Sequence, residues 1–498
     1  MKKYYSILLT CTTLCSAQQA DYVGHIESLP ATKTEQTTTL LEQAQQCMTE
    51  NKHQEALRLC TIIIAQDPTS FRAHLTMGKS HLALNAADAA LASFTKALNT
   101  RPSDDKSAVE LGNCLLNLGN HFFGTHETEK ALDAFKSILT ISENFSAVHH
   151  NIAFTLAEQS GDIHGALEHY RKATNYNPNN VETRFCSSLA LLASGNLVEG
   201  FDAYQTRWKR ANHAPRSFSY PLAKQWDGIA DIRGKRILIN VEQGLGDTLQ
   251  FIRYAQLLKN QGAIVIAEVQ KPLADILSLC PYLDEIVTIG TSLPAFDYQI
   301  PMLNLPHVYK TNLQTIPADI PYLRAAPQLI TQWRSLLAQD TNFKIGICWR
   351  GDSAHGASKF MPFNYFARLA ELPGVSVYSL QKDETTNDQK YNALIQETRI
   401  KRFEGDFDEH HGRFMDTAAV IKNLDLIITV DTSIAHLAGG LGVPTWIVLP
   451  FPAEWRWLIE RDDSPWYPTM RLFRQQEYNN WQGVYTQLLQ ALAERLDA

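Results

Sequence analysis

Apolar and small residues in the first 210 positions recur with a period of 34 residues. Three pairs of positions keep this spacing: Ala56 and Ala90, Pro68 and Pro102, and Gly78 and Gly112. The order of residue types is kept further along, where Ala166, Tyr170, Ala173 and Pro178 repeat Ala90, Phe94, Ala97 and Pro102. Between Pro102 and Pro178 the chain holds two periods plus eight residues, and seven of these fall near NHFFGTHE, between Leu118 and Ala131.

This period predicts two helices per unit. Small residues allow the helices to approach closely, aromatic residues fill the space beside them, and a proline ends the second helix because it lacks an N–H and clashes with the preceding turn. The small residues are Gly78, Ala90 and Gly112, and the aromatic ones are Phe94, Phe135, Tyr170 and Tyr204. The pattern resembles the tetratricopeptide repeat and predicts about five units over residues 37–212, stacked into a curved solenoid with a concave groove. A spacer or an oligomerisation surface is one interpretation; we favour a groove that binds a peptide or protein partner.

A different pattern follows the joint WKRANHAPRSFSYP. Short β-branched runs alternate with helical stretches, which is typical of buried parallel strands. The first series is 235–241, 264–269, 285–289 and 297–302, and the second is 343–349, 375–381, 399–403, 424–430 and 445–450. We expect two α/β domains, 224–326 and 327–498, that face each other across a cleft and bind ligands at the carboxyl ends of their strands.

The first candidate site follows the first strand, in VEQGLGDTLQF. Gly244 and Gly246 suggest a dinucleotide fingerprint, but Leu249 replaces the third glycine and a carboxylate at Asp247 would repel a pyrophosphate. The glycines are better explained by a tight turn that presents Asp247 to the cleft. Asp247 is expected as a helix N-cap or as a catalytic or substrate-binding residue, two roles that are compatible. Glu242, at the same strand end, is the second candidate for a catalytic base.

The second candidate site lies in LDLIITVDTSIAHLAGGLGVP. A buried strand ends at Val430, and Asp431, Thr432 and Ser433 open a helix on which His436 shares a face with Thr432. Backbone N–H groups, a hydroxyl and an imidazole then converge at a helix N-terminus, which suits a departing diphosphate.

Two further segments carry polar side chains. CWRGDSAHGASKFMPF supplies Arg350, His355 and Lys359 on a loop of the same domain, where cations would neutralise phosphate. EGDFDEHHGRF holds Asp406, Asp408, His410 and His411, but without a ligand pattern of fixed geometry we reject a metal site there.

Composition narrows the classes of protein. With 45 Lys and Arg against 52 Asp and Glu, the formal net charge of −7 argues against a nucleic-acid binder. The sequence has no run of about 18 consecutive apolar residues, so we expect no integral membrane segment. Eight scattered cysteines without a Cys-x-x-Cys pair indicate reduced thiols in the cytosol. Residues 1–36 are expected to be disordered or signal-like, since Lys2 and Lys3 precede the weakly apolar YYSILLTCTTLCSA.

Taken together, VEQGLGDTLQF, ICWRG, SLQ, the block from Asp416 to Gln475 and the repeats resemble tetratricopeptide-repeat glycosyltransferases. This resemblance covers roughly residues 37–475, and the catalytic half is similar to the ADP-heptose heptosyltransferases. The architecture is also similar to O-GlcNAc transferase and to repeat-bearing flagellin glycosyltransferases. The resemblance implies an α + α/β fold: a tetratricopeptide solenoid, then a GT-B type pair of Rossmann-like domains, with the acceptor on the first and the donor on the second. One departure is that QFIRY follows Gly246-Asp247 where heptosyltransferases keep a proline.

The resemblance further implies inverting, metal-independent transfer from a nucleotide sugar, with no cofactor. By this resemblance Asp247 is the catalytic base, Lys359 contacts the donor phosphates and Gln381 lies at the nucleotide. The residues that contact the sugar and the diphosphate are Asp431, Thr432 and His436. Such donors are cytosolic, so we expect a cytoplasmic enzyme whose acceptor is a protein recruited by the repeats. The alternatives are a saccharide- or lipopolysaccharide-directed transferase and a binding scaffold with a degenerate transferase domain; a nicotinamide oxidoreductase is the least favoured.

Overall fold

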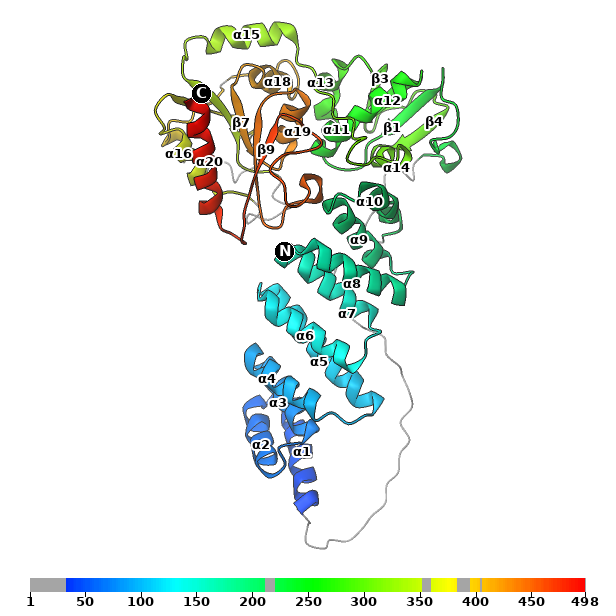
Figure 1. Cartoon of the computed structure of the whole chain (residues 1–498), viewed down its shortest axis with the longest axis vertical. Coiled ribbons are helices and arrows are strands. Elements are labelled where there is room, and N and C mark those ends of the chain that lie inside the picture. The colour runs from blue at the N-terminus through cyan, green and yellow to red at the C-terminus, as the bar shows by residue number, and fades with distance from the viewer. Residues whose placement is uncertain (1–32, 211–219, 352–359, 383–394, 404, 498) are drawn as a thin grey trace. The chain divides into compact units, whose positions relative to one another are not determined.

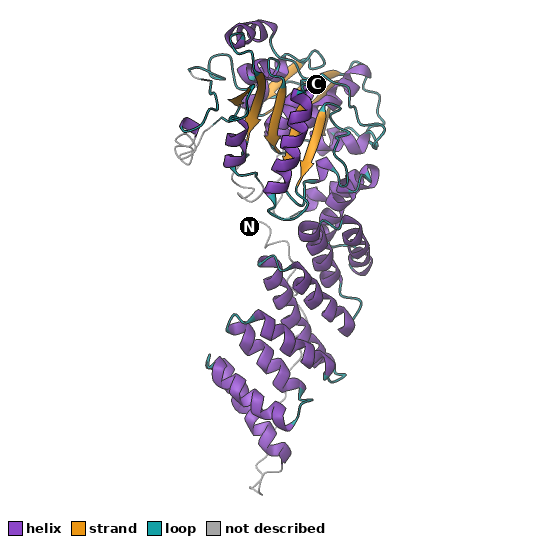
Figure 2. Cartoon of the chain, turned by 60° about the vertical axis from the view of Figure 1, so that its left-hand side comes forward, coloured by secondary structure: helices purple, strands orange, loops and turns teal. Residues whose placement is uncertain are grey.

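The computed structural model describes residues 33–210, 220–351, 360–382, 395–403 and 405–497. The chain divides into two compact units, Met1–Ser187 and Ser188–Ala498. The described part of the first unit contains only helices, whereas the second contains two parallel sheets flanked by helices (Figures 1 and 2). This confirms the predicted fold class of a helical repeat region followed by a pair of α/β domains.

The helices of the repeat region pack as successive pairs, and from α1 to α8 each helix contacts the next one along the chain. Their bounds are α1 Lys33–Thr49, α2 His53–Gln66, α3 Phe71–Ala83, α4 Ala87–Asn99, α5 Asp105–Gly124, α6 Thr128–Ile141, α7 Ser146–Thr155, the π-helical turn η1 Leu156–Ser160, α8 Ile163–Tyr176 and α9 Val181–Ala193. As predicted, α2, α4 and α8 each end shortly before a proline, at Pro68, Pro102 and Pro178.

The extra residues in the third unit lengthen a helix. α5 has 20 residues where α3, its counterpart in the preceding unit, has 13. The seven additional residues fit two turns at 3.6 residues per turn, so they are absorbed without a new loop. The remaining extra residue coincides with η1, and a π-helical turn is how a helix accommodates a single insertion.

This insertion also moves the glycine that lets the two helices of the unit meet. A Cβ on Gly78 would lie 2.4 Å from Phe94 Cε1, and a Cβ on Gly119 would lie 2.4 Å from Phe135 Cε1. By contrast, a Cβ on Gly112 would meet nothing closer than 3.8 Å. The prediction that Gly112 is the close-approach position is therefore wrong, because the two extra turns shift that position to Gly119.

The first sheet of the second unit has the strand order β3-β2-β1-β4, with all strands parallel. Its strands are β1 Arg236–Asn240, β2 Ile264–Val269, β3 Glu285–Thr288 and β4 Tyr298–Pro301. The helices between them are α11 Leu245–Phe251, η5 Ile252–Tyr254, α12 Ala255–Asn260, η6 Lys271–Leu273 and α13 Ala274–Ser278, and η7 Met302–Asn304 and α14 Leu305–Val308 follow β4. The chain reverses its direction of strand addition at β1, so ligands are expected near the carboxyl end of this strand.

The second sheet has the strand order β6-β5-β7-β8-β9, again all parallel. Its strands are β5 Phe343–Cys348, β6 Val375–Ser379, β7 Leu426–Val430, β8 Thr445–Leu449 and β9 Met470–Arg474. The surrounding helices are α15 Pro327–Leu337, α16 Phe363–Leu369, α18 Met415–Ile421, α19 Ser433–Gly440, η10 Trp455–Trp457 and α20 Trp481–Leu496. Every residue of β6, β7 and β8 is buried, as expected for parallel strands that are covered on both faces.

Two strand predictions need correction in this sheet. Residues 399–403 form no strand, and Lys401 makes only an isolated bridge to Tyr378. The apolar pattern did not predict β9, an edge strand in which exposed Arg471 interrupts the buried positions. An edge strand pairs on one side only, so its sequence lacks the continuous apolar run of the central strands.

The last helical turns before the joint belong with the second unit. α10 Leu197–Ala203 and the 3₁₀ turn η2 Tyr204–Lys209 lie beyond Ser188, where this unit begins. They were expected as part of the repeat array that ends at residue 212. Among the described residues, no helix is both long and apolar enough to span a bilayer.

Candidate active site

Asp247 lies in the first turn of α11, directly after the loop that follows β1. Gly244 is the N-cap of the helix, so Asp247 is the third helical residue and not the N-cap that the sequence suggested. Its Oδ2 accepts a hydrogen bond of 2.9 Å from the Gly244 backbone N–H. This is the acidic half of a capping box, which fixes the carboxylate over the start of the helix.

The first turns of α11 and α19 touch each other, which brings the two candidate motifs together. A Cβ on Gly246 would lie 2.8 Å from His436 Cδ2 and 3.7 Å from Ser433 Cα. Only glycine leaves room for this approach, so the role of Gly246 is to let the two helices meet. Asp247 and His436 therefore lie in one site, although almost 190 residues separate them.

Arg456 joins the two α/β domains at this point. Its guanidinium donates to Asp247 Oδ1 through Nη2, to Glu454 Oε1 through Nη1, and at 2.9 Å to Gln250 Oε1 through Nε. Burial disfavours the arginine charge, but Glu454 and Asp247 outweigh it and raise the pKa of Arg456. One guanidinium thus holds two carboxylates, one from each domain.

Glu454 is the more accessible of these two carboxylates, with 36% of its side chain exposed against 18% for Asp247. Burial raises the pKa of Glu454 against the opposing effect of Arg456, and the negative charge of Asp431 raises it further. Neither Glu454 nor Arg456 was predicted from the sequence. Their position shortly after the carboxyl end of β8 was the available signal, because ligand-binding residues gather at that edge of a parallel sheet.

His436 is buried beneath this group of charges. Its Nδ1 lies 2.8 Å from Tyr467 Oη, its ring stacks on Trp457 with centroids 5.6 Å apart, and its Nε2 lies 3.9 Å from Asp431 Oδ1. Burial, reinforced by Arg456 and Arg253, holds the pKa of His436 well below its ordinary value. The imidazole is therefore neutral at physiological pH and can supply a hydrogen bond, but not a positive charge. We call Asp247, Asp431, His436, Glu454 and Arg456 the interdomain cluster.

Glu242 does not belong to this cluster. Its carboxylate receives two hydrogen bonds of 3.0 Å from Arg207 and one of 3.1 Å from the Leu303 N–H, and its side chain is only 2% exposed. A carboxylate enclosed in this way has no access to an acceptor hydroxyl. This geometry contradicts the prediction of Glu242 as the second candidate base, because its local sequence gave no sign of the buried arginine.

The donor-side residues lie at the carboxyl ends of β5, β6 and β7. Gln381 Oε1 accepts a 3.1 Å hydrogen bond from the Arg350 N–H, so these two predicted residues are neighbours. Thr432 is the N-cap of α19, and its hydroxyl lies 3.8 Å from Cys348 Sγ. Ser433 is the first residue of the helix. The sheet therefore brings Arg350, Gln381 and Thr432 to one edge, where β5 and β7 mark its topological switch point.

Three predicted features are placed differently or not at all. Lys359, the residue expected on the donor phosphates, lies outside the described residues, as does His355. Asp408, from the segment rejected as a metal site, accepts a 3.0 Å hydrogen bond from the Thr417 N–H of α18, and His411 Nδ1 lies 3.1 Å from Asp416 Oδ2. These side chains fix the start of a helix. Among the described residues, no group of three or more potential ligands has the geometry to hold a metal ion.

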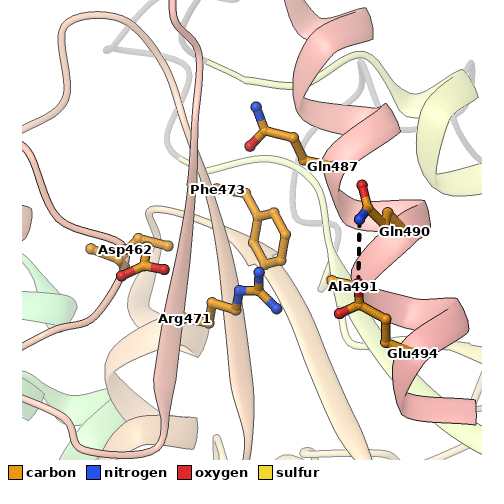
Figure 3. Close-up of a pocket in the computed structure, with 8 residues that line it drawn as sticks. Asp462, Arg471, Phe473, Gln487, Gln490, Ala491 and Glu494 are labelled. Atoms are coloured by element: carbon orange, nitrogen blue, oxygen red, sulfur yellow. Dashed lines mark hydrogen bonds between the residues drawn. The ribbon is translucent and has the colours of Figure 1, made fainter.

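A hollow of about 190 Å³ opens elsewhere in the second domain, between β9 and α20 (Figure 3). Arg471, Phe473 and Gln490 line it, and Gln490 Nε2 donates to Glu494 Oε1 at 3.3 Å. It lies along the side of the edge strand and not at the carboxyl ends of the strands, so it is separate from the interdomain cluster.

Comparison with known proteins gives three kinds of relative. Residues 146–180 match the family model of the tetratricopeptide repeat. Protein FlbA of Caulobacter vibrioides is 25% identical over 438 residues, which cover 82% of this chain and 71% of FlbA. The structure of a glycosyl transferase family 9 protein from Veillonella parvula is 13% identical with a TM-score of 0.41, and the match covers 54% of this chain and 98% of the Veillonella chain. The structure of the ADP-heptose lps heptosyltransferase II of E. coli is 14% identical with a TM-score of 0.39, and the match covers 53% of this chain and 100% of the E. coli chain.

Proposed function

We propose that this protein is a glycosyltransferase that moves a sugar from a nucleotide-sugar donor to an acceptor hydroxyl, with inversion at the anomeric carbon and without a metal ion. The observation that carries the proposal is the contact between the first turns of α11 and α19 at Gly246 and His436. It joins a carboxylate of one α/β domain to a helix N-terminus of the other. These are the two parts that a transfer to a hydroxyl with a diphosphate leaving group requires.

In the proposed mechanism, Asp247 accepts the proton of the acceptor hydroxyl as its oxygen bonds to the anomeric carbon. Each Asp247 oxygen accepts one hydrogen bond within the protein, from Gly244 or from Arg456. A carboxylate has about four lone-pair positions, so an acceptor hydroxyl can still donate to it. The bond from the anomeric carbon to the diphosphate oxygen breaks on the opposite face, and its electron pair leaves with the diphosphate.

The negative charge that develops on the diphosphate needs donors on the second domain. The N-terminus of α19, with Thr432 and Ser433, provides backbone N–H groups and the positive end of the helix dipole. The neutral imidazole of His436 supplies a hydrogen bond, and Lys359 and Arg350 supply positive charge. We place Gln381 and Asp431 on the nucleotide and the sugar. Cations and a helix N-terminus together can do the electrostatic work that a metal does in other transferases.

We further propose that the acceptor is a protein held by the repeat array, and that transfer takes place in the cytoplasm. Stacked repeats form an extended concave surface that is suited to a polypeptide. The family-model match at residues 146–180 supports this part of the proposal.

The test is a thermal-shift screen of the full chain against nucleotide sugars, followed by donor hydrolysis with the sugar that stabilises it. In the variant Asp247→Asn, donor binding should remain near normal while turnover falls by about 100-fold or more, the usual contribution of a general base. Asp275→Asn, a change of the same kind on α13, serves as the control. Wild-type turnover in Asp247→Asn would remove this residue from the mechanism, and no response to any nucleotide sugar would favour the binding scaffold.

A further inference from the structure

The helical turns that follow the repeat array contact the loop that carries Asp247. α10 and η2 bear Phe201, Tyr204 and Arg207, and all three are buried. Their partners include Glu242 and Gln243, which immediately precede the N-cap of α11. The inference below rests on the proposed function, in which Asp247 is the base.

Arg207 fixes the first residue of this loop. Its side chain and that of Glu242 are 0% and 2% exposed, and two hydrogen bonds of 3.0 Å join them. Arg207 Nη2 also donates to Asn304 Oδ1 at 2.5 Å. A buried ion pair is tolerated only when its hydrogen bonds are satisfied, as they are here. Glu242 is therefore tied to the turn η2.

Tyr204 holds the next residue. Gln243 Nε2 donates to Tyr204 Oη at 2.8 Å, and the Gln243 carbonyl accepts from Gln270 Nε2 at 2.8 Å. Gln243 is covalently bonded to Gly244, whose N–H holds the Asp247 carboxylate. Two hydrogen bonds therefore separate the Tyr204 hydroxyl from Asp247.

Tyr204 also contacts the other side of the interdomain cluster. Its ring centroid lies 6.4 Å from that of Trp455, which Phe201 meets edge-on at 5.8 Å. Trp455 precedes Arg456, whose guanidinium carbon lies 4.3 Å from the Trp455 ring centroid. The same tyrosine thus supports the backbone before Asp247 and the aromatic ring beneath the arginine that binds Asp247.

We propose that Tyr204 is a positioning residue for Asp247, through which the helical turns before the first α/β domain set the geometry of proton transfer. The hydroxyl keeps Gln243 and the N-cap in place, while the ring supports Trp455 and Arg456. The turns α10 and η2 then support the loop that carries Asp247 and do more than connect the repeat array to the first α/β domain.

The test uses the full chain with Tyr204→Phe, which removes the hydroxyl and keeps the ring against Trp455. The matched control is Tyr309→Phe, because Tyr309 Oη also accepts from a glutamine, Gln261 Nε2, at 3.1 Å. The first measurement is amide hydrogen exchange of the peptides that cover residues 241–249. We expect exchange to be several-fold faster in Tyr204→Phe and unchanged in Tyr309→Phe.

The second measurement is donor hydrolysis with the nucleotide sugar found in the thermal-shift screen. We expect kcat to fall about tenfold in Tyr204→Phe with KM for the donor within twofold, because a displacement of about 1 Å at a reacting group can cost up to 100-fold. Gln243→Leu should give the same loss, and the double variant should lose no more than either single one, because both changes remove the same hydrogen bond.

The outcomes separate the two proposals. Unchanged exchange in Tyr204→Phe overturns the inference whatever the donor assay gives. Faster exchange with wild-type kcat, or additive losses in the double variant, also overturns it. Faster exchange in Tyr204→Phe together with a wild-type protein that hydrolyses no nucleotide sugar supports the hold of Tyr204 on the loop and overturns the proposed function instead.

Discussion

The contact between α11 and α19 can be tested by adding a single methyl group at Gly246. In Gly246→Ala the new Cβ would lie 2.8 Å from His436 Cδ2, below the distance of about 3.0 Å that side chains tolerate. The imidazole has no room to yield, because Tyr467 holds its Nδ1 and Trp457 covers its face. Overpacking of this kind costs about 1–3 kcal/mol. Alanine returns up to about 1 kcal/mol of helix propensity, so we expect a net loss of up to about 2 kcal/mol relative to the wild type, and of about 1–3 kcal/mol relative to a helical Gly→Ala change that meets no neighbour.

Tryptophan fluorescence during thermal unfolding measures this loss in the right part of the chain. All 9 tryptophans lie between Trp208 and Trp481, within the second unit, so unfolding of the repeat region does not contribute. A loss of 1 kcal/mol should lower the midpoint by about 2–4 °C in a domain of this size. The control is Gly483→Ala, also in the first turn of a helix, where a Cβ would meet nothing closer than 3.5 Å. If both variants unfold at the same temperature, the two helices do not meet as described.

Two further predictions concern the repeat region and the pH dependence of stability. Gly119→Ala should destabilise the first unit by about 1–3 kcal/mol, because Phe135 fills the space that the new methyl group would need. Gly112→Ala in the same helix should stabilise this unit by up to about 1 kcal/mol, because its methyl group meets no close neighbour. Helical circular dichroism during denaturation compares the two variants, and equal effects would contradict the shift of the close-approach position to Gly119. The lowered pKa of His436 means that acid protonates this histidine in the unfolded chain before the folded one, so stability should fall as the pH drops below about 6.5, by at most about 1.4 kcal/mol per pH unit. His436→Gln should lack this contribution, and parallel stability curves for the two proteins between pH 7.5 and 5 would refute a buried neutral imidazole.

Local patterns were sufficient to predict most of the fold. The period of 34 residues and its prolines located the ends of α2, α4 and α8, because proline lacks an N–H and its ring clashes with the preceding turn of a helix. The runs of β-branched residues located eight of the nine strands in the described parts of the chain. The meeting of Asp247 and His436 was also predictable, because each follows the carboxyl end of a strand at a switch point of its sheet.

The errors arose where a residue's role depends on a distant partner. Gly112 kept the period but not the contact, because two helical turns were inserted before Gly119. Glu242 has the position of a base, and only Arg207, 35 residues earlier, shows that it is enclosed. Arg456 acts on Asp247 across 209 residues of sequence. No spacing rule connects such pairs, and the tertiary fold alone brings them together.

In each of the two α/β domains, one arginine donates hydrogen bonds to groups of the other domain, and these bonds affect the position of Asp247. Arg456 of the second domain donates to Asp247 and Gln250 of the first, while Arg253 of the first donates to the Trp466 carbonyl of the second at 2.6 Å. The Arg253 Nε also donates to the Gln250 carbonyl at 2.9 Å, so Gln250 contacts both arginines. Any change in the angle between the domains must stretch the hydrogen bonds of Arg456 to Asp247 and Gln250 together with that of Arg253 to Trp466. Asp247 is therefore held in place from both domains, and its position depends on their packing as well as on the loop that carries it.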